Sequence, residues 1–216
     1  MSEPAVTPMP PPARPAATVI VVREGPQGLE VLMVERAAAP DQYGGAWVFP
    51  GGRVEALDEA QHPGQAHPVA AIRECFEEAG ILFAYDRLGQ LVDGAHPDFA
   101  ALAAQRLALA EGRLTLADLC GRHGLRLAPD RLRHFAHRIT PLARPKRFDT
   151  HFYVAPLPPG QQAETDGREI VGHDWLRPAE ALASGETRKL MTVTRDMLEA
   201  IGRFGSVEAL MESLGA

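Results

Sequence analysis

The fold is decided by residues 49–83, FPGGRVEALDEAQHPGQAHPVAAIRECFEEAGILF. Near the end of this stretch Arg73, Glu74, Glu77 and Glu78 fall within six positions. The three glutamates share one face of a helix because residues three and four apart are neighbours there. Carboxylates held this closely repel one another unless a cation lies between them, and hard divalent cations such as Mg²⁺ bind carboxylates together with water and phosphate oxygens. The helix alone is equally consistent with a solvated acidic face in which Arg73 only pairs with Glu77.

The helix follows a glycine loop, Pro50-Gly51-Gly52, that comes directly after a short apolar strand. Glycine lets a backbone approach another group closely or take a positive φ. Loop and helix together resemble the Nudix hydrolase signature, G-x5-E-x7-R-E-U-x-E-E-x-G-U, in which U is an apolar residue. The second half of this signature is matched throughout, by Arg73, Glu74, Cys75, Glu77, Glu78, Gly80 and Ile81.

The chain departs from the signature between loop and helix. Asp58 stands where the first glutamate is expected, and fourteen residues separate it from Arg73, seven more than the pattern has. The extra stretch contains Pro63-Gly64, so we expect it to lengthen the loop and not the helix. We predict a mobile lip over residues 58–67 that is not part of the catalytic frame. A box interrupted here resembles the Nudix subfamily that includes the mammalian peroxisomal coenzyme A diphosphatase.

The resemblance implies hydrolysis of a diphosphate linked to another moiety, with Mg²⁺ or Mn²⁺ as cofactor. It implies catalytic roles for Arg73, Glu74 and Glu77, and metal ligation by Glu74, Glu77, Glu78 and the Gly52 carbonyl. Arg73 would orient Glu74 and offset its charge. The candidates for substrate binding are Arg36, Phe49, Gly51 and Arg147, although Arg147 is equally consistent with a surface pair to Asp149. Glu164 and Glu169 flank a loop that often carries a further carboxylate in this fold.

The box indicates the chemistry, whereas the substrate depends on flanking loops. Nudix proteins that cleave coenzyme A carry a second signature before the box, L-L-T-x-R-[SA]-x3-R-x3-G-x3-F-P-G-G. Residues 32–52, LMVERAAAPDQYGGAWVFPGG, keep its register with Arg36 in place, but Asp41 replaces the second arginine. A carboxylate there would repel a 3′-phosphate that an arginine could hold. We expect coenzyme A or an acyl derivative, with ADP-ribose or another nucleotide as the alternative. A Nudix-fold binding module that has lost catalysis is a further alternative, against which the intact Arg-Glu…Glu-Glu core argues.

Hydrophobic patterning predicts an α+β protein, a mixed sheet sandwiched between helices. Residues 1–16 are proline-rich and predict a disordered tail, followed by a domain over 17–216 with a helical insertion at 97–126. We expect strands at 17–24, 29–36, 46–50, 132–142, 149–157 and 169–176. We expect further helices at 68–79, 177–185 and within 192–215. Trp47 and Trp175 are predicted to be core residues.

Composition limits the class of protein. The 22 basic and 28 acidic residues give a net charge of −6, which disfavours nucleic-acid binding because that needs a basic face. Two cysteines, Cys75 and Cys120, make neither a disulfide framework nor a zinc site, and a reducing, cytoplasmic setting fits them. The eight histidines show no metal-ligand spacing, and no apolar run approaches the roughly 20 residues that cross a bilayer. The expected partner is a small nucleoside-diphosphate substrate, and a homodimer is left open.

Overall fold

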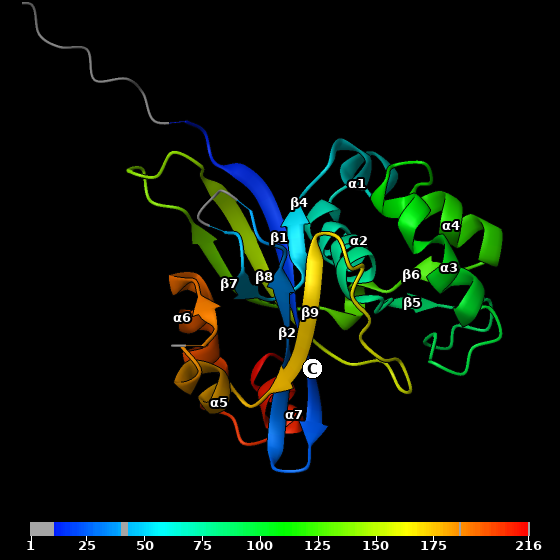
Figure 1. Cartoon of the computed structure of the whole chain (residues 1–216). Helices are drawn as coiled ribbons and strands as arrows, with labels where there is room; N and C mark the ends of the chain where they lie inside the picture. Colours follow the sequence, from blue (N-terminus) through cyan, green and yellow to red (C-terminus); the bar gives the residue numbers. More distant parts are fainter. Residues whose placement is uncertain (1–10, 40–42, 186, 216) are drawn as a thin grey trace, which may run out of the picture.

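A mixed sheet forms the centre of the molecule (Figure 1). The computed structural model describes residues 11–39, 43–185 and 187–215. The strands of the sheet are β1 (Arg14–Gly25), β2 (Gly28–Arg36), β3 (Ala46–Val48), β4 (Gly51–Arg53), β7 (Arg133–Ile139), β8 (Phe148–Pro156), β9 (Ile170–Leu176) and β10 (Lys189–Leu190). The short strands β5 (Ala84–Tyr85) and β6 (Arg126–Leu127) pair separately.

The strand order is β10-β3-β2-β1-β8-β7, with β4 beside β1 and β9 beside β2. β1 runs parallel to β8, and β10 runs parallel to β3. The other pairs in this sheet are antiparallel. The predicted α+β class with a mixed sheet is therefore confirmed.

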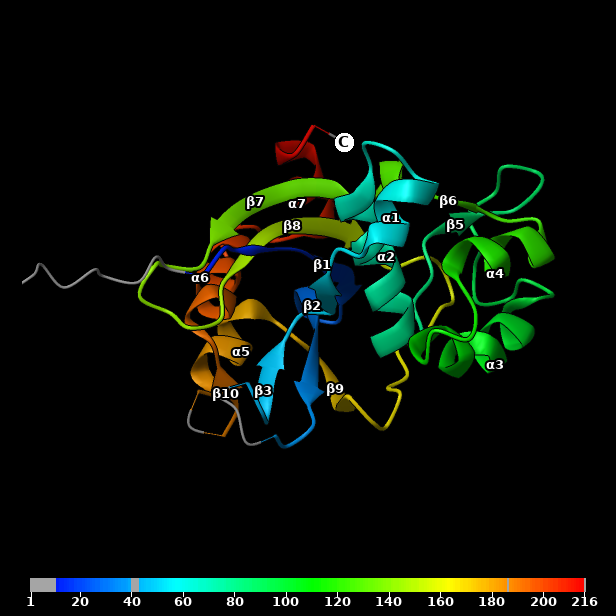
Figure 2. The same ribbon diagram turned by 90° about the horizontal axis from the view of Figure 1, so that it is seen from above.

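Helices cover both faces of the sheet, as the view from above shows (Figure 2). On one side lie α1 (Ala56–Gln61), α2 (Ala66–Ala79), α3 (Phe99–Ala110) and α4 (Leu116–His123). On the other lie α5 (Pro178–Ala183), α6 (Thr192–Ile201) and α7 (Val207–Ser213). A single 3₁₀ turn, η1, spans Pro129–Arg131. The chain is thus a three-layer sandwich over its described residues.

Alternation along the strands builds one core on each face. Side chains of successive strand residues point to opposite faces. In β1, Val19 and Val21 join the core under α2, whereas Ile20 and Val22 join the core under the C-terminal helices. The apolar runs of the central strands are buried on both faces, which explains why they read as nearly continuous hydrophobic segments.

Helix α2 carries the charged motif, and its limits follow from the sequence. It begins at Ala66, two residues before Pro68, a residue that the first helical turn tolerates because its missing N–H has no partner there. It stops at Gly80, whose φ of 70° is left-handed and whose N–H donates to the Phe76 carbonyl oxygen. The buried side of the helix, which includes Ile72 and Phe76, packs on the sheet.

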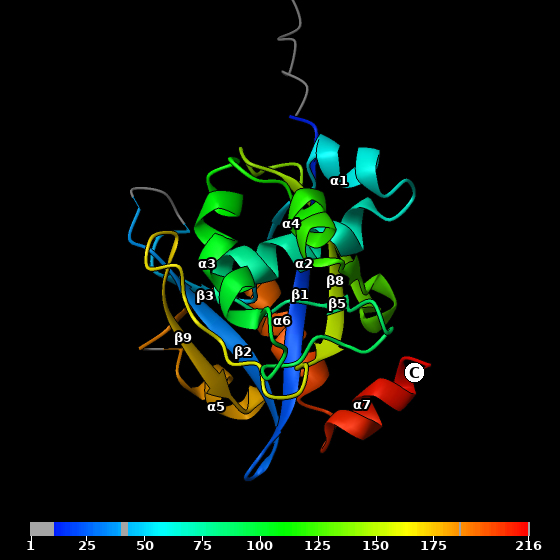
Figure 3. The same ribbon diagram turned by 90° about the vertical axis from the view of Figure 1, so that its right-hand side faces the viewer.

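Residues 97–126 contain two helices, α3 and α4, which lie beside α2 when the molecule is seen from their side (Figure 3). The two helices are separated near Gly112, which has a φ of 67°. Both cysteines are free and buried, Cys75 in α2 and Cys120 in α4. Trp175 packs against the core under α2, and Trp47 packs against the other core. Among helices of the described residues, none is long and apolar enough to cross a membrane.

Three local expectations need correction. The tail predicted over 1–16 is wrong from Arg14 onward, where β1 begins because Arg14 already pairs with Phe148 of β8; residues 1–10 lie outside the described residues. The loop expected at Gly51–Arg53 is instead β4, paired with β1. The loop expected over 58–67 is wrong at 58–61, which belong to α1.

Candidate active site

Strand β4 holds the glycine loop between the sheet and α2. Gly51 lies opposite Thr18 of β1, and a side chain at Gly51 would place its Cβ only 2.5 Å from the Ala17 carbonyl oxygen. A separation that short is a steric overlap, so the close approach of the two strands requires glycine. The Gly51 N–H donates to Glu78 Oε2 at 2.9 Å. The loop and the helix of the sequence motif are thereby joined directly.

Arg73 is the centre of a hydrogen-bonded network. Its Nε and Nη2 donate to the two carboxylate oxygens of Asp58, each at 3.1 Å. Its Nη1 donates to Glu74 Oε1 at 3.0 Å and lies 3.4 Å from Glu77 Oε2. Its Nη2 also donates to the Arg53 carbonyl oxygen of β4 at 2.8 Å. One buried guanidinium therefore fixes two helices and a strand, and the pairing with Glu77 is only one of its contacts.

The carboxylates differ in how much of them reaches solvent. The side chain of Glu78 is 6% exposed, whereas those of Glu74 and Glu77 are 16% and 15% exposed. A Cβ on Gly52 would lie 2.4 Å from the Glu74 carboxyl carbon. Glycine at position 52 therefore leaves room for that carboxylate against β4. A small hollow of ≈ 120 Å³ opens beside Glu77, bordered on the other side by residues 109–116 of the insertion.

Burial makes these carboxylates hard to ionise. It raises the pKa of Glu74 above its ordinary value, against the opposing effect of Arg73. It raises the pKa of Glu77 to about 7, again against Arg73. It raises the pKa of Glu78 well above its usual range, and the charge of Glu74 adds to this effect. Burial alone would lower the pKa of Arg73, but its bond to Asp58 and the charges of Glu74 and Glu77 raise that pKa.

We call Asp58, Glu74, Glu77 and Glu78 the acidic cluster. With all four carboxylates ionised and two guanidiniums in reach, those of Arg73 and Arg36, the formal charge is −4 + 2 = −2. Buried carboxylates in excess of their cations are stabilised by a further cation. The donors are carboxylate oxygens beside a backbone loop, the ligand type that Mg²⁺ and Mn²⁺ prefer. The residues present therefore fit a hard divalent cation.

Asp58 was underestimated by sequence reasoning. It is 3% exposed and holds Arg73 with both carboxylate oxygens. Its Oδ2 also accepts the Glu55 N–H at 2.8 Å, at the start of α1. The prediction that residues 58–67 stand outside the catalytic frame is wrong at Asp58. The signature register, which leaves five residues between Gly52 and Asp58, was the signal that pointed to it.

Comparison with known proteins agrees with this geometry. The family profile described as the NUDT19 Nudix domain matches residues 60–200, and the general NUDIX domain profile matches residues 12–100. The first of these spans more than half of the chain. The chain belongs to the Nudix hydrolase family.

Individual relatives are distant. The acyl-coenzyme A diphosphatase NUDT19 of Homo sapiens is 33% identical over 55% of this chain and 34% of its own length. Its counterpart of Xenopus laevis is 24% identical over 74% of this chain and 56% of its own length. This Nudix chain thus spans about half or less of these relatives. The crystal structure of a NUDIX hydrolase from Alicyclobacillus acidocaldarius superposes with a TM-score of 0.82 at 26% identity, covering 94% of this chain and 97% of that one.

The other residues predicted to bind substrate, Arg36, Phe49 and Arg147, lie in different surroundings. Arg36 ends β2 with Nη1 3.9 Å from Glu78 Oε1, at the acidic cluster. Phe49 is 3% exposed and packs in the core under the C-terminal helices. A buried side chain contacts neighbours and not ligands, so the structure favours a packing role for Phe49. Arg147 donates to the carbonyl oxygens of Thr140 and Pro11.

Glu164 and Glu169 are the two loop acids that the sequence offers as a possible further carboxylate of the site. The charge of Glu169 raises the pKa of Glu74 and of Glu78, which places it within electrostatic reach of the acidic cluster. Burial lowers the pKa of Arg106, and the charge of Glu164 opposes this by raising it, so Glu164 lies near Arg106 instead. Glu169 is therefore the better candidate for an additional carboxylate. Asp41, the departure from the coenzyme A signature, lies outside the described residues.

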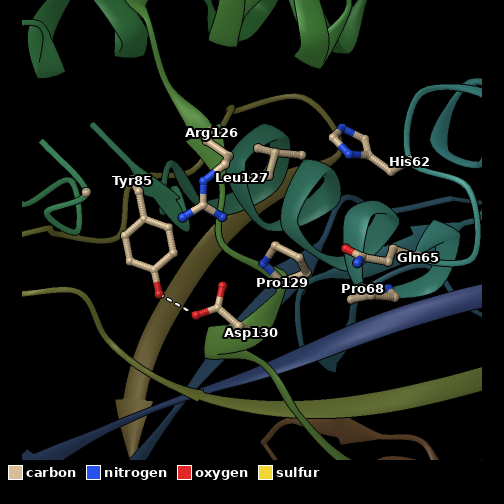
Figure 4. Close-up of a pocket in the computed structure, with 9 residues that line it drawn as sticks. His62, Gln65, Pro68, Tyr85, Arg126, Leu127, Pro129 and Asp130 are labelled. Atoms are coloured by element: carbon tan, nitrogen blue, oxygen red, sulfur yellow. Dashed lines mark hydrogen bonds between the residues drawn. The ribbon is translucent and has the colours of Figure 1, made fainter. Parts of the chain in front are cut away.

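A wider pocket lies apart from the acidic cluster (Figure 4). Its volume is ≈ 780 Å³, and its walls include His62 and Pro68 on one side and Tyr85, Arg126 and Asp130 on another. Figure 4 shows the Tyr85 hydroxyl directed at Asp130, and these groups form a hydrogen bond of 2.5 Å. The Arg126 guanidinium lies 4.7 Å from the Tyr85 ring centre. Because Arg126 and Asp130 are already engaged with Tyr85, and no glutamate of the acidic cluster lines the pocket among its described walls, size alone does not make it the reaction site.

Proposed function

We propose that the chain hydrolyses the diphosphate linkage of a nucleoside-diphosphate derivative with the help of Mg²⁺ or Mn²⁺. The observation that carries the proposal is the acidic cluster. Four carboxylates, with a formal charge of −2 when all are ionised, are held against a glycine loop by Arg73 and the Gly51 N–H. An arrangement of this kind suits a cation that in turn binds the oxygens of a diphosphate.

A bound divalent cation would neutralise the diphosphate and stabilise the charge that develops in the transition state. Glu74, Glu77 and Glu78 would supply its side-chain ligands, with the Gly52 carbonyl as a further one. Arg73 positions Glu74 and Glu77 through the contacts described above. Asp58 keeps the Arg73 guanidinium in place.

The reaction consumes one water molecule. Its oxygen attacks one phosphorus, the bridging P–O bond breaks, and two phosphate monoesters leave. A carboxylate accepts the proton of the attacking water. Glu77 is well placed for this role, because it reaches the surface at the small hollow beside the insertion. Arg36, at the other end of the cluster, is in position to meet a phosphate oxygen.

Coenzyme A or an acyl-coenzyme A is the substrate we favour. The NUDT19 relatives carry the name acyl-coenzyme A diphosphatase, and the stretch 32–52 keeps most of the coenzyme A signature. Asp41 favours the alternative, a substrate with fewer phosphates such as ADP-ribose, since a carboxylate repels a 3′-phosphate. A silent binding module would retain ligand affinity without turnover, and the intact Arg73 network argues against it.

A substrate panel tests the proposal. Coenzyme A, dephospho-coenzyme A and ADP-ribose are incubated side by side with the protein and Mg²⁺ or Mn²⁺, and the products are identified by mass. We expect 3′,5′-ADP and 4′-phosphopantetheine from coenzyme A, and no turnover in the presence of a chelator. Cleavage of ADP-ribose with coenzyme A untouched would overturn the substrate assignment. Binding without cleavage of any of the three would overturn the enzymatic one.

Other expectations on setting and partners stay predictions. These are a cytoplasmic location, a homodimer and the absence of nucleic-acid binding. Size-exclusion chromatography with light scattering measures the oligomeric state directly.

A further inference from the structure

A second group of metal-binding side chains lies outside the acidic cluster. His137 of β7 and Asp149 and His151 of β8 each offer a ligand atom, and these three atoms lie within 4.8 Å of one another. His137 contacts Asp149 directly, and its ring stacks on that of His151 at 4.4 Å between centres. We call these residues, with His67 and His134 packed against them, the histidine cluster.

A β-bulge creates this arrangement. His134 and His137 are three residues apart, so in a regular strand they would point to opposite faces. The register of β7 shifts between His134 and Ala136, so that His134 lies opposite Tyr153 and His137 lies opposite His151. Tyr153 and His151 are two apart on β8 and share a face. The bulge therefore turns both β7 histidines to the same side, which is a known use of bulges.

Helix α2 supplies a further imidazole from above this face. The His67 ring, in the first turn of α2, lies 4.3 Å from the His151 ring centre. The His134 ring is 5.2 Å from His151, and its Nε2 lies 3.1 Å from His151 Nδ1. His151 is thus surrounded by three imidazoles drawn from two elements. Each neutral imidazole ring offers one unshared nitrogen pair to a cation.

We propose that the histidine cluster binds a borderline divalent cation of the Zn²⁺ class, with His137, Asp149 and His151 as ligands. Ligands of a tetrahedral zinc site at bonds of about 2.0–2.1 Å are separated by roughly 3.3 Å. The His137 and Asp149 atoms, already in contact, would need to separate slightly, whereas the other pairs would close by about 1.5 Å or less, and both changes need only side-chain rotation. His67 or His134 is in place to give a fourth ligand or to hydrogen-bond a ligating ring.

The ligand types separate this site from the acidic cluster. Imidazole nitrogen suits Zn²⁺, Co²⁺, Ni²⁺ and Cu²⁺, whereas an all-oxygen set suits Mg²⁺ and Mn²⁺. The side chains of His137 and Asp149 are 43% and 37% exposed, so a cation can enter from solvent. The proposal does not depend on hydrolysis, because it concerns binding at other residues.

Zinc binding by the full chain, free of any histidine tag, tests the proposal. The titration is run in a large excess of Mg²⁺, which occupies the acidic cluster, and free Zn²⁺ is reported by a competing chromophoric chelator. We expect one equivalent of Zn²⁺ in the unaltered protein and at least tenfold weaker binding in His151→Ala and in His137→Ala. His173→Ala, an exposed strand histidine outside the cluster, and Glu77→Gln should bind as the unaltered protein does.

Thermal unfolding with and without Zn²⁺ shows whether each variant folds. A cation that binds the folded state raises Tm, so we expect a zinc-dependent rise in the unaltered protein that is absent from the two cluster variants. Zinc affinity that is unchanged in both His variants, lost only in Glu77→Gln, or undetectable in the unaltered protein would overturn the assignment.

Discussion

The acidic cluster and the histidine cluster lie close together on one face of the sheet but are built in different ways. Gly52 of the glycine loop pairs with Ala17, and Ala17 pairs with His151 on its other side. Two strand spacings, roughly 10 Å, therefore separate the backbone of Gly52 from that of His151. The acidic cluster is buried and locked by Arg73 and a backbone N–H. The histidine cluster is half-exposed and held mainly by packing among rings.

The two clusters differ in how well the sequence predicts them. The glutamates stand on one helix at spacings of three and four, so the helix itself brings them together. The histidines come from a strand with a bulge, a neighbouring strand and a helix, and only the sheet register brings them together. We therefore expect the acidic cluster to be rigid and needed for the reaction, and the histidine cluster to bind a softer cation.

The largest effect should come from removing a carboxylate of the acidic cluster. Glu77→Gln keeps the side-chain shape but removes a charge that would face the cation, so we expect turnover to fall by roughly 100- to 1000-fold. Steady-state assays on the best substrate of the panel measure this. Glu199→Gln, an exposed glutamate of α6, is the matched control. Near-full activity in Glu77→Gln would remove the acidic cluster from the reaction.

A stability measurement probes how rigid the acidic cluster is. Asp58→Ala leaves the buried Arg73 without its two-oxygen partner, and breaking such a pair costs about 3 kcal/mol of the free energy of unfolding. Glu74 and Glu77 remain as partners, which keeps the loss near the lower end of the usual range. Urea unfolding followed by circular dichroism measures it.

The control for this experiment is Glu59→Ala, the exposed neighbour of Asp58, which should change stability by less than about 0.5 kcal/mol. An equal, small effect of both substitutions would mean that residues 58–67 form the mobile lip first expected from the sequence.

A smaller effect is expected at the glycine loop. Gly51→Ala pushes a Cβ to 2.5 Å from the Ala17 carbonyl oxygen, and the forced shift of β4 should cost about 1–3 kcal/mol. Gly121→Ala, within α4 and with open space around its Cβ, should be neutral or stabilising by up to about 1 kcal/mol. Thermal unfolding of the pair gives the comparison. A neutral Gly51→Ala would show that the loop tolerates a wider spacing from β1.

Much of the fold was open to prediction because its signals are local. The β-branched runs gave β1 and β2, Pro68 and Gly80 marked α2, and Gly112 marked the break in the insertion. Strand β4 was missed because three residues, Gly-Gly-Arg, carry no strand signal. It exists because β1 offers the carbonyl and N–H groups that pair with it.

The sequence also indicated which residues would come together in the acidic cluster. The signature named the residues around Arg73, and the register pointed at Asp58, whose bidentate contact depends on how α1 folds back onto α2. Substrate binding by Phe49 and Arg147 stays a prediction, because the sequence does not say which face of the sheet a flanking residue takes. The sequence did not predict the histidine cluster, because it depends on a β-bulge. The residues His134–His137 carry no signature of that register shift.

Direct binding of Mn²⁺, measured from the electron paramagnetic resonance signal of the free ion, tests most directly whether the acidic cluster is the hard-cation site. The titration compares the unaltered protein with Glu78→Gln and with His151→Ala. We predict that Mn²⁺ binds the unaltered protein and His151→Ala with similar affinity, and binds Glu78→Gln at least tenfold more weakly. Equal Mn²⁺ affinity in all three proteins, or a loss in His151→Ala with Glu78→Gln unaffected, would contradict the account.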